Sequence, residues 1–408
     1  MNRNRDRIVI TGVGIVSSLG IGKEEFWDSL SKGRSGVSEV SSFDTSSFQT
    51  HLGGEVKRFD YRRWIDGELP NESARATQFL IAASSLAYAD AGWALDGLRD
   101  VRTGVCVGTN MGEIQALERI DEALARNQET SISSELVRAY AEPCLSSRVM
   151  RKFGFSGPSI VIPTACSAGN FAIGYAYDLL RLGRADVMFA GGVDPFSRIA
   201  FTGFNRLFAV TKSRCSPFDK NRSGIVVGEG CGTLILERLN GALSRGAVPY
   251  AEVLGYGLSC DAFNMVAPTV GGIVSAMSAA LRSCGKIPRD VDYICAHGTG
   301  TIANDKTESA AVNQLFRDQR PDRVPISSIK SMLGHTMGAA SAIEAIACAL
   351  SIRHSLIPPT INFETPDPEC DVDCVPNESR HKELNIVLNN SFAFGGNNAS
   401  LVLGKITK

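Results

Sequence analysis

The cysteine at position 166 is the residue whose surroundings most clearly indicate chemistry. It lies in the segment P-T-A-C-S-A-G (163–169), between an expected strand (159–162) and an expected helix (170–182). A thiol at the start of a helix feels the partial positive charge of unpaired N–H groups, which favours the thiolate. The alternative is a small buried side chain without reactivity, which is the more common role of a free cysteine.

Two of the five histidines lie in similar settings at the ends of expected strands. His297 is in Y-I-C-A-H-G-T-G-T (293–301), and His335 is in S-S-I-K-S-M-L-G-H-T-M-G (327–338). A nucleophilic cysteine generally needs a base and polarising groups, which imidazoles can supply. We therefore predict that both histidines act with Cys166. The other histidines are expected at the surface: His51, His354 and His381.

Other kinds of site find less support in the sequence. Cys370, Cys374 and His381 are close together but lack the four-ligand spacing of a structural zinc site. The G-x-S-x-G signature of hydrolases is absent. The segment T-G-V-G-I-V-S (11–17) lacks the third glycine of a dinucleotide-binding loop, and no phosphate-binding Walker sequence occurs.

Composition limits the partners and the compartment. The chain has 408 residues, is 44% hydrophobic, and carries 42 basic against 43 acidic residues, for a net charge of −1. This balance gives no general attraction to nucleic acid or to anionic membranes, so neither is expected as a partner. Eleven cysteines without regular spacing indicate reduced thiols in a cytoplasmic protein. We expect the basic N-terminus to lead into a buried strand and not a signal peptide.

Short apolar runs alternate with helical patterns, which is typical of an α/β protein. The expected strands are 8–10, 104–108, 159–162, 186–190, 231–236, 292–296 and 385–390. The expected helices are 73–91, 170–182, 273–283, 306–316 and 338–353. A boundary near 240–258 predicts two halves, 1–250 with the cysteine and 251–408 with both histidines. Each half places a reactive residue at a strand-to-helix turn, as a duplicated fold would.

The motifs together resemble the elongating type II β-ketoacyl-[acyl-carrier-protein] synthases of the thiolase superfamily. They are T-A-C-S-A-G, then A-H-G-T-G-T with N-D-x-x-E after it (Asn304, Asp305, Glu308), K-S-M-L-G-H, and N-S-F-A-F-G-G-N-N (390–398). The resemblance covers essentially the whole chain. It implies a thiolase-like duplicated fold of five αβαβα layers, which is usually dimeric.

The resemblance also implies roles for the matching residues. Cys166 would accept the acyl chain as a thioester, and His297 and His335 would bind the malonyl thioester and promote loss of CO2. Backbone N–H groups of Cys166 and Phe394 would form the oxyanion hole. Lys330 and Glu344 match the supporting charged pair of the family, which could also be a purely structural salt bridge.

Further positions concern the substrate arm and the acyl chain. Thr299 and Thr301 match residues that hydrogen-bond phosphopantetheine, although turn stabilisation is an alternative. Phe394 matches a gate between the malonyl and acyl pockets. Asn110, Met111 and Phe204 are assigned to the acyl pocket.

Several residues depart from the fatty-acid pattern of the family. Asn110 and Met111 replace smaller residues, and Asn264 and Val266 stand where histidine and threonine are common. Arg75 remains in a segment, 71–77, that is less basic than is usual where the carrier protein docks.

The predicted reaction is a decarboxylative Claisen condensation of malonyl-carrier protein with the Cys166-bound acyl chain. A type II polyketide pathway is the preferred setting. Fatty-acid elongation by a homodimer is the alternative, and a non-catalytic scaffold subunit is the alternative from another class. No cofactor is expected beyond the phosphopantetheine of acyl carrier protein. The second subunit would be either an identical copy or a chain-length-factor-like chain.

Overall fold

The large sheet of this protein joins the two halves of the chain. The computed structural model describes residues 7–65, 74–94, 97–140, 144–319 and 322–407. The strands of the sheet are β1 (Ile8–Ser17), β2 (Gly20–Ile21), β5 (Thr103–Gly108), β6 (Ser159–Ile162), β7 (Val187–Asp194), β8 (Gly230–Arg238), β9 (Ala251–Cys260), β10 (Tyr293–Cys295), β11 (Ile326–Ser327), β14 (Ile386–Phe392) and β15 (Asn397–Gly404). Two short pairs lie apart from it: β3 (Ser38–Glu39) with β4 (Leu52–Gly53), and β12 (Leu356–Ile357) with β13 (Arg380–His381).

The strand order repeats from one half to the other. The first half runs β6-β5-β7-β8-β1, and the second runs β11-β10-β14-β15-β9. In each half the first three strands in this order are parallel, and the last two pair antiparallel. The halves meet where β1 pairs with β9, from Ile8 opposite Val253 to Ile10 opposite Ala251. This repetition shows a duplicated α/β fold.

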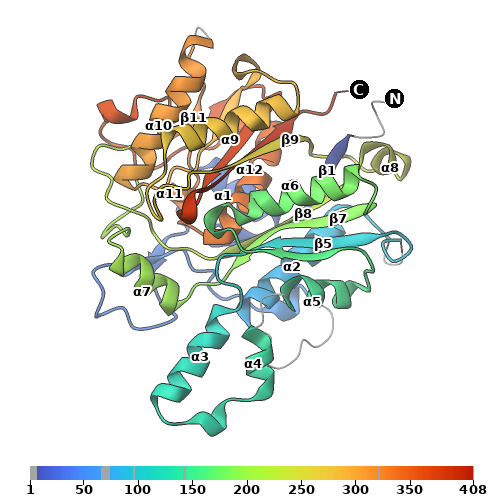
Figure 1. The fold of residues 1–408 in the computed structure, drawn as a ribbon, viewed down its shortest axis with the longest axis vertical. Coiled ribbons are helices and arrows are strands. Elements are labelled where there is room, and N and C mark those ends of the chain that lie inside the picture. The colour runs from blue at the N-terminus through green and yellow to red at the C-terminus, as the bar shows by residue number, and fades with distance from the viewer. Residues whose placement is uncertain (1–6, 66–73, 95–96, 141–143, 320–321, 408) are drawn as a thin grey trace.

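Helices form three layers around the two half-sheets (Figure 1). The helices are α1 (Lys23–Ser31), α2 (Arg75–Asp90), α3 (Ile114–Ala125), α4 (Ser134–Tyr140), α5 (Cys144–Phe153), α6 (Ala168–Arg181), α7 (Arg198–Arg206), α8 (Leu239–Ser244), α9 (Val270–Ser283), α10 (Ile302–Phe316), α11 (Lys330–Leu333) and α12 (Ala340–His354). Helices α2 and α5 cover one half-sheet, and α9 and α10 cover the other side of the molecule. Helices α6 and α12 lie between the half-sheets and contact both of them. This arrangement is the expected five-layer fold.

The middle layer is built from small and apolar side chains. In α12 every residue from Ala340 to Ile352 is buried, as expected of a helix that is enclosed on all sides. Helices α6 and α12 approach closely, because a Cβ atom on Gly169 would lie only 2.6 Å from the amide nitrogen of Ala342. The starts of these two helices are therefore held in a fixed relation to each other.

The expected strands and helices are all present in the described residues, with boundaries shifted by a few residues; residue 73 lies outside them. Strands β9 and β15 were not predicted, because glycine or asparagine interrupts their apolar patterns. The two-residue strands and seven shorter helices were not predicted either: α1, α3, α4, α5, α7, α8 and α11. Helices α3 and α4 project from the body of the molecule (Figure 1). In the described part of the chain, no helix combines the length and the apolar character that crossing a membrane requires.

Candidate active site

Cys166 lies in a tight turn between β6 and α6. The turn, Ala165–Ser167, is a single stretch of 3-10 helix, and Ala165 has a left-handed backbone with φ of 51°. Such a φ is uncommon for a residue with a side chain, and it gives the chain a sharp change of direction just before the thiol. The hydroxyl of Ser391, on β14 of the other half, donates to the Cys166 carbonyl at 2.9 Å. The turn is thus fixed from both halves.

Burial dominates the ionisation of the thiol. It raises the pKa of Cys166 to about 12, although the charge of Lys330 and the backbone N–H groups of Phe394 and Cys166 act in the opposite direction. The backbone N–H groups favour the thiolate, as expected, but they do not determine the net pKa. Loss of solvation outweighs the partial charge of the helix terminus. The N–H groups of Phe394 and Cys166 lie close to the sulfur, and their role as an oxyanion hole stays a prediction.

The two histidine rings lie edge to face, with centroids 5.5 Å apart. The Met337 N–H donates to Nδ1 of His335 at 3.1 Å, so a neutral His335 carries its proton on Nε2. Burial and the nearby Lys330 charge lower the pKa of His297 and of His335 well below the ordinary value. Both rings are therefore neutral at physiological pH.

Lys330 and Glu344 form an ion pair that is buried on both sides. Burial raises the pKa of Glu344 to about 7, and the ammonium group of Lys330 opposes this change. Because the Lys330 charge also lowers the pKa of both histidines, Lys330 acts on the site electrostatically. Neither residue lines the cavity described next.

Cys166, His297 and His335 line one narrow cavity of about 60 Å³. The other lining residues are Phe204, Ala209, Ile225, Asn264, Met265, Val266, Ala267, Pro268, Thr299, Thr301, Ala303, Asn304, Phe392, Ala393 and Phe394. Asn110 and Met111 are not among them. Met111 instead packs into an apolar cluster that also includes Phe204 and Phe394. The assignment of Asn110 and Met111 to an acyl pocket stays a prediction.

The residues expected to bind the substrate arm and to form the gate lie around this cavity. The hydroxyls of Thr299 and Thr301 are 2.8 Å apart, and Thr301 also caps α10. The Phe394 ring lies 6.1 Å from that of Phe204. Gly395 follows Phe394 with φ of 80°, and its N–H donates to the Met265 carbonyl at 2.8 Å. Glycine adopts this left-handed backbone without strain, and the gate role of Phe394 stays a prediction.

Two buried carboxylates position the site, and neither was given a role from the sequence, where Glu308 appears only as part of the N-D-x-x-E motif. Both oxygens of Glu308 accept backbone N–H groups, from His297 at 2.9 Å and from Gly298 at 2.8 Å. Asp194, at the end of β7, accepts from the N–H groups of Asn110, Met111 and Gly338, at 2.8, 2.9 and 2.6 Å. The one available signal for Asp194 was its position as a charged residue at the end of an apolar run.

Arg75 differs from its expected place on a docking surface. Its guanidinium donates to both oxygens of the buried Glu229, at 2.7 and 2.6 Å. It also lies 4.6 Å from the centre of the Phe79 ring. The Arg75 charge is therefore paired with a carboxylate of the same chain. Residues 71–73 of the same segment lie outside the described residues.

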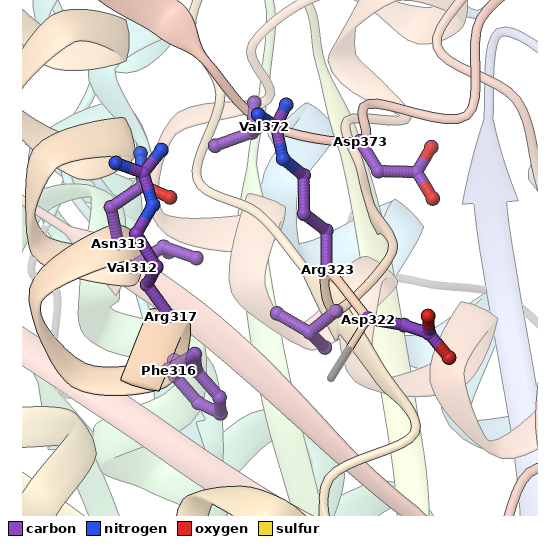
Figure 2. Close-up of a pocket in the computed structure, with 9 residues that line it drawn as sticks. Val312, Asn313, Phe316, Arg317, Asp322, Arg323, Val372 and Asp373 are labelled. Carbon is purple, nitrogen blue, oxygen red and sulfur yellow. The ribbon is translucent and has the colours of Figure 1, made fainter. Parts of the chain in front are cut away.

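A second hollow is larger than the cavity at Cys166, but its side chains form no catalytic group (Figure 2). It measures about 190 Å³ and lies beside the end of α10. Figure 2 shows its two arginines, Arg317 and Arg323, and both pair with the single carboxylate of Asp371. Asp373, also in its wall, pairs with Arg380. Among the described residues that line this hollow, none is a histidine or a cysteine.

Comparison with known proteins agrees with this geometry. Residues 5–242 match the family model "Beta-ketoacyl synthase, N-terminal domain", and residues 250–364 match "Beta-ketoacyl synthase, C-terminal domain". The 3-oxoacyl-[acyl-carrier-protein] synthase 2 of Synechocystis sp. is 37% identical over 99% of this chain and 99% of its own. The enzyme of the same name from Coxiella burnetii is also 37% identical, over 98% of this chain and 99% of its own.

Solved structures give the same result. The ishigamide ketosynthase/chain length factor is 44% identical, with a TM-score of 0.95 over 98% of this chain and 99% of its own. Another solved structure contains a type II polyketide synthase acyl-carrier protein in complex with its ketosynthase, which is bound to the hexaketide. One of its chains is 31% identical to this chain, with a TM-score of 0.90 over 98% of this chain and 99% of its own. Full-length similarity at these identities, together with a shared cavity for the cysteine and both histidines, leads to one conclusion: this chain belongs to the β-ketoacyl synthase family of the thiolase superfamily.

Proposed function

We propose that this chain condenses malonyl-carrier protein with an acyl chain held on Cys166, releasing CO2 and giving a β-ketoacyl-carrier product. The observation that carries the proposal is the cavity that Cys166, His297 and His335 share. Among the described residues that line it, these three are the titratable side chains. The relatives named 3-oxoacyl-[acyl-carrier-protein] synthase 2 support an acyltransferase of this kind.

The first step transfers the acyl group to the enzyme. The sulfur of Cys166 attacks the carbonyl carbon of the acyl-carrier thioester, and the carrier thiol leaves with the proton that Cys166 gives up. Because burial raises the pKa of Cys166 to about 12, this proton must leave as the sulfur attacks. The acceptor at hand is the neutral imidazole of His297, because His335 already carries a proton on Nε2 and its Nδ1 accepts the Met337 N–H. The N–H groups of Cys166 and Phe394 donate to the oxyanion that develops.

The second step forms the carbon–carbon bond. The Nε2–H of His335 donates to the malonyl thioester oxygen, with His297 beside it, and stabilises the enolate that remains when CO2 departs. The enolate carbon attacks the Cys166 thioester, the C–S bond breaks, and the released thiolate takes up a proton. Because both imidazoles are neutral, each donates a hydrogen bond without carrying a full charge, and the Lys330 charge supports that state.

The substrates reach this cavity on the phosphopantetheine arm of acyl carrier protein. Thr299 and Thr301 lie on the cavity wall, where their hydroxyls can hydrogen-bond such an arm. The solved complex between an acyl-carrier protein and its ketosynthase supports this partner. The reaction as written needs no other cofactor.

A type II polyketide or related secondary-metabolite pathway is the preferred setting. The support is the 44% identity to the ishigamide ketosynthase/chain length factor, against 37% to the synthase 2 enzymes. In this setting a chain-length-factor-like chain is the second subunit. Fatty-acid elongation by a homodimer is the alternative that the synthase 2 relatives favour. Purification as a stable homodimer would support the alternative, and insolubility without a homologous partner would support the heterodimer.

Two smaller parts of the proposal concern organisation and location. We place the boundary between the halves at residues 250 and 251, and the start of β9 at Ala251 supports this choice. We place the protein in the cytoplasm, where the unpaired cysteines of the described chain would stay reduced.

The test separates decarboxylation from condensation. In Cys166→Gln the glutamine imitates the acylated cysteine, so the variant is expected to lose condensation and to keep or gain release of CO2 from malonyl-carrier protein. His51→Ala, at an exposed site, is the matched control and should behave as the wild type. Absence of CO2 release from Cys166→Gln would contradict the roles given to His297 and His335.

A further inference from the structure

Phe208 places a large apolar side chain in solvent at an unfavourable backbone conformation. Its side chain is 82% exposed, and its φ is 53°. The residue follows α7, whose end is closed by hydrogen bonds from Phe208 N–H to the Asn205 carbonyl and from Ala209 N–H to the Phe204 carbonyl, both at 3.1 Å. In this helix ending the left-handed position is usually glycine, because a side chain there meets the backbone.

Six other described helices end in the same way and follow that rule. In each, the N–H group after one left-handed residue donates to the carbonyl five positions earlier. The residues at that position are Gly33, Asn127, Gly154, Gly183, Gly246 and Gly285. Only the end of α7 carries an aromatic residue in this set. Backbone strain that persists at an exposed site is a reason to look for a function there.

Phe208 lies next to the outer end of the catalytic cavity. Its neighbour Ala209 lines that cavity, as do Met265 and Ala303. Met265 is 74% exposed, so this part of the cavity wall reaches solvent. Ile302, beside Ala303, is 63% exposed. We call Phe208, Met265, Ile302 and Phe263, which is 79% exposed, the apolar rim.

The reaction determines what covers this rim. A thioester that reaches Cys166 on an arm attached to a protein places the body of that protein over the outer end of the cavity. Exposed cations, Arg206 and Lys212, lie in the same segment as Phe208 and suit a partner with acidic side chains around an apolar centre. Arg75, in the segment where a basic docking site was expected, is instead bound to Glu229.

We propose that Phe208 is an anchor for acyl carrier protein, and that the apolar rim contacts the apolar surface of the carrier around the base of its phosphopantetheine arm. This inference rests on the proposed function for the identity of the partner. Contact with the carrier buries the aromatic ring and compensates for its unfavourable backbone. The rim, and not Arg75, is then the main source of affinity in this part of the surface.

The test measures binding directly, without turnover. Holo-acyl carrier protein of the same organism, labelled with a fluorophore away from its arm, is titrated with the wild type, Phe208→Gly and Phe208→Asn. We expect the dissociation constant to rise about tenfold in both variants. The melting temperature should stay the same or rise, because glycine and asparagine tolerate the left-handed backbone. Leu182→Ala, at a 75% exposed apolar residue that closes α6, is the matched control and should bind as the wild type.

A kinetic comparison distinguishes failure of this inference from failure of the proposed function. The fall in kcat/KM caused by Phe208→Gly should be at least about five times larger with malonyl-carrier protein than with malonyl-pantetheine, which has no carrier. Unchanged carrier binding by both Phe208 variants would overturn the inference even if the wild type condenses its substrates. A wild type that binds the carrier through Phe208 but does not condense would instead overturn the proposed function.

Discussion

The turn that opens α6 and the turn that opens α12 are two copies of one structure with different chemistry. Each comes after the edge strand of its half-sheet, β6 or β11, although α11 intervenes in the second half. Each is a short stretch of 3-10 helix, Ala165–Ser167 in one and Met337–Ala339 in the other. Each begins with a left-handed residue, Ala165 with φ of 51° and Met337 with φ of 53°. The backbone of the two turns is therefore nearly the same.

The residue at the centre of each turn differs. The first turn has Cys166, and the second has Gly338. A Cβ atom on Gly338 would lie 2.5 Å from the Asn110 nitrogen and 2.7 Å from an oxygen of Asp194. The second turn therefore has no room for a nucleophile, and its N–H instead donates to Asp194.

A second pair of equivalent positions shows the same division. Asn110 and His297 are each two residues beyond the end of the second strand of a half-sheet, β5 and β10. The first half supplies an amide there, and the second supplies an imidazole. The two halves thus provide similar frameworks, one of which carries the cysteine and the other both imidazoles.

The largest effect is expected when the first turn is made like the second. Cys166→Gly removes the acyl acceptor, and we expect the condensation rate to fall by about 10⁴-fold or more, as for other nucleophile deletions. The measurement is β-ketoacyl product formation by mass spectrometry. Cys260→Ser, at an exposed cysteine, is the control and should keep the wild-type rate.

The state of the thiol can be tested through pH. Because the pKa of Cys166 is raised to about 12, its thiolate fraction should rise tenfold for each pH unit below that value. Alkylation of Cys166 by iodoacetamide should thus accelerate about 10³-fold from pH 6.5 to pH 9.5 without a plateau. Peptide mass mapping measures this rate. A plateau near pH 7 would show that the helix start outweighs burial after all.

Making the second half like the first should have a somewhat smaller effect. His297→Asn copies Asn110 into the equivalent position and removes one of the two imidazoles. In the Cys166→Gln background, CO2 release from malonyl-carrier protein should fall by about 10²–10³-fold, the usual loss for one donor to a developing oxyanion. An unchanged rate would assign the chemistry to His335 alone.

The smallest effect is expected on stability. Gly338→Ala forces a methyl group against the backbone of Asn110 and should lower the free energy of unfolding by about 1–3 kcal/mol. Urea denaturation measures this change. Cys166→Ala, in the equivalent turn, only removes a sulfur atom and should cost less. Equal costs at both positions would mean that the two turns are not packed differently.

The sequence was sufficient to predict what depends on local pattern. The turn at Cys166, the loops of His297 and His335, seven of the described strands and the five longest of the described helices follow from apolar runs and short motifs. Properties that depend on distant segments were not predictable. The pKa of Cys166 depends on burial by both halves, and the role of Asp194 depends on N–H groups near residues 110 and 338. The left-handed backbone at Phe208 carries no sequence signal, because its position is one that glycine normally takes.

The most direct test of the account is the intact mass of the protein after mixing with an acyl-carrier thioester. The wild type should gain the mass of one acyl group, and Cys166→Ala should gain none. A gain in both proteins would place the acyl group elsewhere, and a gain in neither would leave Cys166 a structural residue; either result would contradict the proposal that this turn holds the nucleophile.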